Sequence, residues 1–158
     1  MSYIRQKKVL FNKENSPATQ TISDSYTEIT GSRAEILSFN SSAKFVYRFC
    51  FNIAPNTSAD KWFLHVKLQK SNDNFSSDIN DISGANYNVA SDFTSAIDHL
   101  YRLNTAFFVI DNLIGTNQVR LVCRAYSNSY KPQLHTVDYF DGIASSKILD
   151  PSLVIFEV

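Results

Sequence analysis

A strict alternation of side chains over residues 44–53 constrains the fold more than any other feature of this chain. The odd-numbered positions are all large and apolar: Phe45, Tyr47, Phe49, Phe51 and Ile53. The positions between them are mostly polar: Lys44, Val46, Arg48, Cys50 and Asn52. Because successive side chains of a β-strand point to opposite faces, this period of two predicts a long strand with one buried face. It excludes an amphipathic helix, whose apolar residues would recur every three or four positions.

A second alternating row follows a turn over residues 55–58. Its apolar members are Trp62, Leu64, Val66 and Leu68. They are opposed by Lys61, His65, Lys67 and Gln69. We expect the two rows to pair as an antiparallel hairpin with one face buried and the other face wetter.

Shorter strand patterns occur along the rest of the chain. They cover residues 26–29, 33–39, 105–110, 119–126, 134–139 and 153–158. Twelve Phe and eight Tyr in 158 residues also favour strands. The last strand is apolar, so we expect it to be paired inside a sheet, because an exposed apolar edge would aggregate. About eight strands predict an all-β domain over residues 24–158, a two-sheet antiparallel sandwich of jelly-roll type.

Two stretches lack the strand pattern. Residues 1–23 are mixed and polar, and we expect them to form an extended N-terminal arm. Residues 71–99 contain five Asp and no Lys or Arg, which predicts a long polar connection with a short helix near residues 91–100. Long connections of this kind are often functional.

The acidic part of this connection has some features of a calcium site. Residues 78–84 place several oxygen ligands close together before Gly84, and calcium takes six to eight oxygens. The spacing departs from the helix-loop-helix pattern, because Ile82 stands two positions before the glycine and no bidentate Glu follows. The spacing therefore favours a solvated loop, and the sequence alone does not decide whether this loop binds calcium. No cofactor is predicted.

Charge and hydropathy exclude several partners. The formal net charge is zero, so we expect no basic surface for nucleic acid. No apolar stretch reaches the roughly 20 residues of a membrane span. Residues 1–8 are basic but have no apolar core behind them, so we expect synthesis and retention in a cytosol. Cys50 and Cys123 are too few for a disulfide scaffold, and we expect free thiols.

Catalytic patterns are missing from the sequence. His65, His99 and His135 stand alone, without a ligand or acid–base partner at a useful spacing. There is no nucleophile elbow, phosphate-binding glycine loop, dinucleotide fingerprint or zinc-type cysteine pair. We therefore expect a protein that is not an enzyme.

Sugar binding is the alternative that the aromatic residues keep open, because sandwich lectins stack sugars on exposed rings. The candidate residues are Trp62, Tyr87, Tyr126 and Tyr130. Tyr126 and Tyr130 flank the polar residues 127–129 and would form a loop that faces a partner.

Three C-terminal stretches carry a resemblance to a known group. An Arg-Ala-Tyr-Ser turn closes residues 119–129, a Leu-His strand and an aromatic-Asp-Gly turn follow over residues 134–142, and an apolar strand fills residues 151–158. This order resembles the C-terminal third of jelly-roll domains in virion and appendage proteins of marine viruses and phages. Such domains are similar to the jelly rolls of complement C1q and tumour necrosis factor, which assemble as trimers.

The resemblance implies a non-enzymatic structural protein of a virus or bacteriophage particle. It would be a capsid decoration, head-fibre or tail-fibre component, made in the host cytoplasm and located on the virion. Its partners would be copies of itself in a homotrimer, other virion proteins and, at a free tip, a host-surface glycan. A threefold interface would include Tyr101, Phe107 and Tyr139. The arm would anchor the trimer through Arg5, Lys7, Lys8, Phe11 and Lys13, folding on contact.

Overall fold

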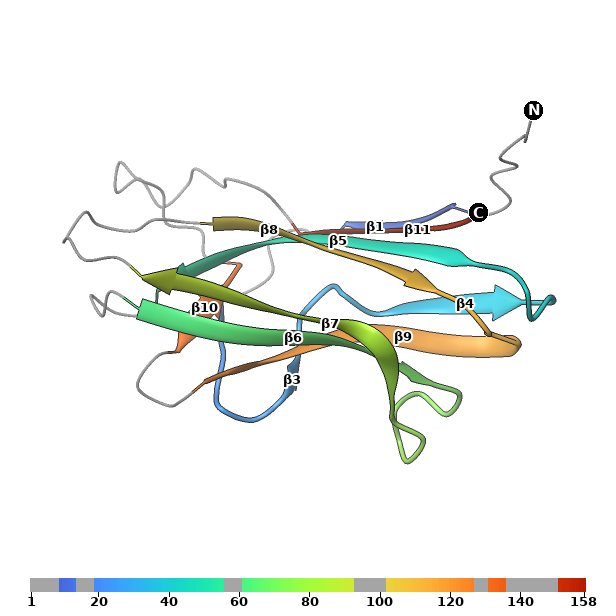
Figure 1. Cartoon of the computed structure of the whole chain (residues 1–158), viewed down its shortest axis with the longest axis horizontal. Helices are drawn as coiled ribbons and strands as arrows, with labels where there is room; N and C mark the ends of the chain where they lie inside the picture. Colours follow the sequence, from blue (N-terminus) through green and yellow to red (C-terminus); the bar gives the residue numbers. More distant parts are fainter. Residues whose placement is uncertain (1–8, 14–18, 56–60, 93–101, 127–130, 136–150) are drawn as a thin grey trace.

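The computed structural model describes residues 9–13, 19–55, 61–92, 102–126, 131–135 and 151–158. Within these ranges the regular structure consists of β-strands, and the strands form two antiparallel sheets that pack face to face (Figure 1). This confirms the prediction of an all-β, two-sheet sandwich.

The first sheet is built around its central strand. It contains β1 (Val9–Lys13), β2 (Gln20–Thr21), β5 (Phe45–Pro55), β8 (Arg102–Ile110), β10 (Pro132–Leu134) and β11 (Ser152–Glu157). β8 pairs with one edge of β5, and β11 followed by β10 pairs with the other edge. β1 lies outside β11, and β2 lies outside β10.

The second sheet has a similar plan. It contains β3 (Thr27–Glu28), β4 (Ala34–Ser38), β6 (Lys61–Ser71), β7 (Asn80–Asp92) and β9 (Gly115–Ala125). β6 pairs with β7 on one side and with β9 on the other. β4 and β3 pair in succession with the outer edge of β9.

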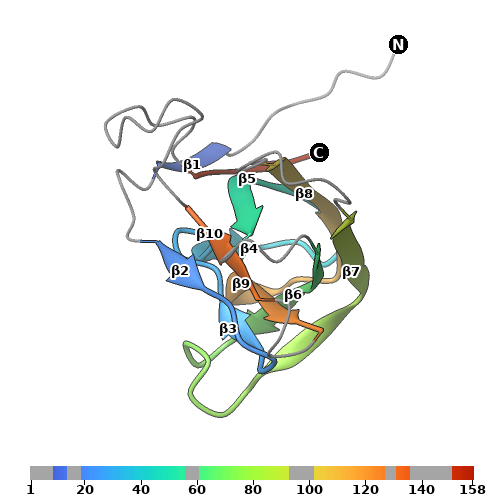
Figure 2. The same ribbon diagram turned by 90° about the vertical axis from the view of Figure 1, so that its left-hand side faces the viewer.

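The order of the long strands is that of a jelly roll. It reads β1-β11-β5-β8 in the first sheet and β4-β9-β6-β7 in the second. The chain changes sheet from β4 to β5, from β5 to β6, from β7 to β8 and from β8 to β9, so consecutive strands face each other across the core (Figure 2). These crossovers between two four-stranded layers are the double Greek key of this architecture.

The predicted hairpin between the two alternating rows is wrong, although both rows are correctly assigned as strands. β5 and β6 belong to different sheets. The apolar row of each is buried, with Tyr47, Phe49, Leu64 and Val66 all inaccessible to solvent. Alternation shows that a strand has one buried face. It does not show whether the next strand lies beside it or opposite it, and here the two buried rows lie opposite each other.

The prediction of a long polar connection over residues 71–99 is also wrong in part. Its second half contains β7, which pairs with β6 along most of its length. The inward positions of β7 are Ala85, Tyr87 and Val89, whereas Asn86 and Asn88 face outward. Small and polar residues are weak strand formers, so pairing with β6 decides the structure here and local propensity does not. Residues 91 and 92, expected to open a helix, end β7, and residues 93–100 lie outside the described residues.

Both ends of the chain contribute to the first sheet. β11 lies between β1 and β5, which confirms that the apolar C-terminal strand is paired. β1 and β2 fall inside the range 1–23 that the sequence assigns to the arm, and they pair with β11 and β10. Arg5, Lys7 and Lys8 lie outside the described residues, so the anchoring role of the arm stays a prediction.

The two cysteines are free thiols, as expected. Cys123 is buried on the inner side of β9, and Cys50 is half-buried on the outer side of β5. They lie on opposite sides of the first sheet's backbone and cannot meet.

The core position of Phe49 predicts a large effect of its truncation. Phe49 is fully buried and stacks on Phe51 with ring centroids 5.5 Å apart, so Phe49→Ala should lower the free energy of unfolding by about 3–5 kcal/mol. The matched control is Phe39→Ala, because Phe39 is 90% exposed, and it should change stability by less than about 0.5 kcal/mol. Chemical denaturation measures both, and equal losses would show that the register of β5 is wrong.

Candidate functional site

The outer side of the first sheet carries an apolar surface. We call it the apolar face and define it by Leu103, Phe107, Val109, Val154 and Phe156 of β8 and β11, with the buried Val46 of β5 between them. The β8 members are the most open, with Leu103, Phe107 and Val109 57%, 58% and 54% exposed. Among the described residues, nothing covers these three β8 side chains fully, whereas Val46 and Asn52 on the same side of β5 are buried.

The strand register makes the apolar face contiguous. Val46 of β5 lies between Phe156 of β11 and Val109 of β8. One step along, Arg48 is flanked in the same way by Val154 and Phe107. Arg48 is exposed and is the charged residue of β5 on this face. The apolar side chains thus run across three neighbouring strands with one guanidinium among them.

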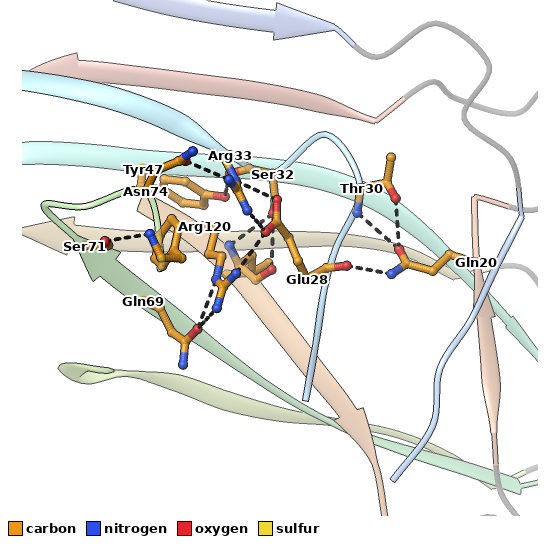
Figure 3. A network of polar contacts seen from close by, with 12 residues as sticks. Gln20, Glu28, Thr30, Ser32, Arg33, Tyr47, Gln69, Ser71, Asn74 and Arg120 are labelled. Carbon is orange, nitrogen blue, oxygen red and sulfur yellow. Dashed lines mark hydrogen bonds and ion pairs between the residues drawn. The ribbon is translucent and has the colours of Figure 1, made fainter. Parts of the chain in front are cut away.

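The outer side of the second sheet has the opposite chemistry. Its side chains include Glu28, His65, Lys67, Asp81, Arg120 and Arg124, and we call it the polar face. Part of it is a network of charged groups drawn in Figure 3. The Glu28 carboxylate accepts hydrogen bonds from Arg33 and, at 3.2 Å, from Arg120 Nη1. Arg120 also donates to Gln69 Oε1 through Nε and Nη2, at 3.1 and 3.0 Å.

A buried hydrogen-bonded group beside this network ties the two sheets together (Figure 3). The Tyr47 hydroxyl, from the first sheet, donates to the carbonyl oxygen of Ser32 at 2.7 Å. The Ser32 hydroxyl donates to the Leu121 carbonyl at 3.2 Å and accepts from the Leu121 amide at 3.1 Å. Burial raises the pKa of Tyr47, which keeps its hydroxyl protonated and able to donate.

One end of the sandwich carries a smaller exposed apolar cluster, which we call the tip. Phe39 follows β4 and is 90% exposed, and Ile114 precedes β9 and is 70% exposed. The pairing of Ser38 with Gly115 brings them to neighbouring positions. Asn40 Oδ1 accepts from the amide and hydroxyl of Ser42 at 3.0 and 2.7 Å, so the turn that presents Phe39 is well defined.

Few of the residues that the sequence nominated for an interface are described. Phe107 lies on the apolar face, as the interface prediction requires, whereas Tyr101 and Tyr139 lie outside the described residues. The backbones of Phe11 and Lys13 belong to β1. The structure therefore places one of the three predicted interface residues on the exposed apolar surface.

The aromatic residues considered for sugar binding separate into two groups. Trp62 is core, at 2% exposure, and the half-buried Tyr87 donates to Asn104 Oδ1 at 3.0 Å. Tyr126 is 76% exposed at the end of β9, and its ring meets Phe63 edge to face at 5.9 Å. Tyr130 lies outside the described residues.

The acidic residues considered for calcium are used within their own loop. Asp73 accepts hydrogen bonds from the hydroxyls of Ser77 and Ser71 and from the amides of Ser76, Ser77 and Asp78. The bonds from Ser77, Asp78 and Ser71 lower its pKa. Asp78 accepts from the Asn72 amide at 3.2 Å. In the part of the chain that the structure describes, no three His, Cys, Asp or Glu side chains are grouped as metal ligands.

Sequence reasoning missed the charged network of the polar face. Glu28, Arg33 and Arg120 are distant in the chain or separated by a turn, and each alone reads as an ordinary surface charge. Their meeting depends on β3, β4 and β9 being neighbours, which no local pattern encodes.

Comparisons with protein-family models and with curated proteins gave no match to this chain. Over the described ranges, no helix has the length and apolar character needed to cross a bilayer. The function is therefore argued from the geometry of the two outer faces.

His135 predicts a dependence of stability on pH. It follows β10 in the left-handed region, with φ 59°, and is 3% exposed. Burial lowers its pKa from 6.5 to about 4, although the backbone of Thr30 partly offsets this. The unfolded chain therefore binds a proton at this residue before the folded chain does, and stability falls as the pH drops from about 6.5 to about 4.

The loss due to His135 should be on the order of 3 kcal/mol across that window. The comparison is His135→Asn, since asparagine tolerates the left-handed backbone and does not titrate. Urea denaturation between pH 7 and pH 4 should give a shallower decline for the variant than for the natural chain. Parallel declines would show that His135 is not buried in its neutral form.

Proposed function

We propose that this chain is a non-enzymatic structural protein of a virus particle that assembles as a homotrimer through its apolar face. The role would be that of a capsid decoration, head-fibre or tail-fibre component, made in the host cytoplasm and carried on the virion. The observation that carries the proposal is the exposed row Leu103, Phe107 and Val109 beside Val154 and Phe156.

The contrast between the two outer faces supports an interface at the first sheet. Both sheets turn an apolar side inward, yet the outer side of the second sheet is mostly charged and amide groups, whereas the outer side of β8 is mostly apolar. Contiguous exposed apolar patches on soluble domains are commonly interaction sites. Arg48 is compatible with such a role, because arginine is enriched in interfaces and stacks on aromatic rings such as Phe107.

The shape of the patch fits a closed ring of subunits. The most exposed side chains belong to β8, which forms the edge of the first sheet beyond β5. A contact between this edge of one copy and the flat part of the face on the next copy is head-to-tail, and such contacts form a ring when the rotation between copies closes. The resemblance of the C-terminal third to trimeric jelly rolls supports three as the number of copies.

The end of the molecule that carries the tip fits attachment to another virion protein. β1 begins at Val9, which pairs with Phe156, and the Val158 amide donates to the Lys44 carbonyl at 2.9 Å. Figure 1 shows the C-terminus, the end of β4 and the turn between β8 and β9 at this same end. The chain before Val9 thus joins the sandwich near Phe39 and Ile114, where the arm and the tip would meet the same partner.

A glycan-binding, lectin-like module is the second candidate, and the exposure of Tyr126 favours it. The Tyr126 amide donates to the Phe63 carbonyl at 3.0 Å, so the ring is held at a fixed position at the end of β9. An exposed and fixed aromatic ring is the element on which sugars stack. Loss of glycan-array binding on Tyr126→Ala would support this reading, and an array without hits would remove it.

The assembly proposal predicts a specific effect of charges on the apolar face. The natural chain should have the mass of a trimer in size-exclusion chromatography with light scattering at micromolar concentration. The double substitution Phe107→Lys with Val109→Lys should give a folded monomer, because burying two ammonium groups against apolar side chains is costly.

The matched control is Leu37→Lys. Leu37 is an exposed apolar residue of similar size on β4 of the second sheet, 40% exposed, and its substitution should leave the trimer intact. A natural chain that is monomeric at micromolar concentration would contradict the proposal. A double variant that remains trimeric would place the interface elsewhere.

A further inference from the structure

A tyrosine on the polar face is contacted by two cations from two different strands. Tyr26 precedes β3 and is 39% exposed. Lys67 Nζ of β6 lies 4.0 Å from the centroid of its ring, and the guanidinium carbon of Arg124, on β9, lies 5.1 Å from it. Both distances are within the range of a cation–π interaction. Two positive charges from the outer side of the second sheet thus lie within cation–π distance of one ring.

His65 adds a third polar group to this set. Its Nδ1 lies 2.6 Å from the Tyr26 hydroxyl, and it is the direct cross-strand partner of Arg124. When the phenol donates to Nδ1, the imidazole carries its proton on Nε2 and can donate from there. We call Tyr26, His65, Lys67 and Arg124 the Tyr26 cluster.

The same face contains a closely related arrangement that is already complete. Arg33 and Arg120 lie over the ring of Phe75, with guanidinium carbons 5.1 and 4.0 Å from its centroid. Glu28 forms ion pairs with both arginines, so a carboxylate of the chain itself joins the two cations. Two cations on one aromatic ring are thus stabilised here by an internal anion.

The Tyr26 cluster differs in lacking that bridging anion. Asp81 pairs with Lys67 at 2.7 Å and also accepts from Gln69 at 2.9 Å. Among the described residues, no carboxylate forms an ion pair with Arg124. Arg124 is exposed, and its planar fork of donors suits a carboxylate or sulfate group.

We propose that the Tyr26 cluster binds an external oxyanion that bridges Lys67 and Arg124, as Glu28 bridges Arg33 and Arg120. Two cations and the carboxylate of Asp81 leave a single net positive charge, which suits a singly charged carboxylate or sulfate ester better than a phosphate dianion. Acidic sugars carry these groups, and the exposed Arg124 and the partly exposed ring of Tyr26 would meet the charged group and the face of a saccharide. The ligand class is therefore an acidic glycan.

This site goes beyond the assembly proposed above and is independent of it. It lies on the second sheet, whereas the proposed interface lies on the first, so a trimer would leave three copies of the site open to solvent. Three copies that engage one multivalent glycan would bind more tightly than one. Because the Phe107→Lys, Val109→Lys variant keeps the polar face, failure of assembly and failure of anion binding give separate results.

The test is a titration of the full chain followed by amide NMR shifts. The probes are sodium sulfate, sodium phosphate, a heparin-derived tetrasaccharide, sialyllactose and neutral lactose. The two acidic oligosaccharides should shift the amides around His65 and Arg124 saturably, and lactose should not. Arg124→Gln should weaken binding at least tenfold, and Tyr26→Phe should weaken it less by releasing only the contact with His65.

Lys44→Gln is the matched control, since it removes one exposed positive charge away from the cluster. It should leave the affinity unchanged, and thermal unfolding should show that every variant is folded. If sulfate binds, neither acidic oligosaccharide binds, and Arg124→Gln abolishes the sulfate binding, the oxyanion site is supported and its ligand is a free anion. The proposal is overturned if no acidic probe saturates, if phosphate binds more tightly than sulfate, or if Lys44→Gln weakens binding as much as Arg124→Gln.

Discussion

The inward aromatic row of β5 is the constraint on which the rest of this molecule depends. Phe45, Tyr47, Phe49, Phe51 and Ile53 bury one side of the central strand of the first sheet. A shift of one residue in the pairing of any neighbour would turn its apolar set away from the core, so the register of β8 and β11 is fixed by this row. The positions left on the other side are then fixed as well, and in β8 and β11 all of them except Thr105 and Ser152 are apolar. The exposed apolar face is thus a direct consequence of the strand register.

The two outer faces show how differently the two sheets meet their surroundings. On the second sheet, Glu28, Arg33, Arg120 and Gln69 form hydrogen bonds with one another, so this part of the polar face is stable in contact with water. On the first sheet, removing the exposed apolar side chains of β8 from water would be favourable through the hydrophobic effect. The shared apolar core joins these unlike layers, and the hydrogen bond from Tyr47 of the first sheet to Ser32, which is itself bonded to Leu121 of the second, adds a polar link. One sandwich therefore presents an apolar outer surface on one sheet and a charged outer surface on the other.

The sequence predicts this fold where the alternation is strong and fails where it is weak. The rows of Phe49 and Leu64 were assigned to buried faces correctly, because a period of two has no other simple meaning. Their pairing was not predictable, since facing and neighbouring strands give the same pattern. β7 was missed because its inward residues are few and small, as Ala85 shows. The apolar face had a visible signal, since residues 105–110 are apolar at both registers, whereas the Tyr26 cluster depends on contacts between distant strands.

An image of the purified oligomer tests the central claim most directly, that the apolar face is an interface between copies of this chain. A cryo-electron microscopy reconstruction should show three copies around a threefold axis. In it, Phe107 and Val109 of each copy should be excluded from solvent by the neighbouring copy, with Arg124 on the outside. An assembly in which β8 faces solvent, or particles that contain a single copy, would contradict the account.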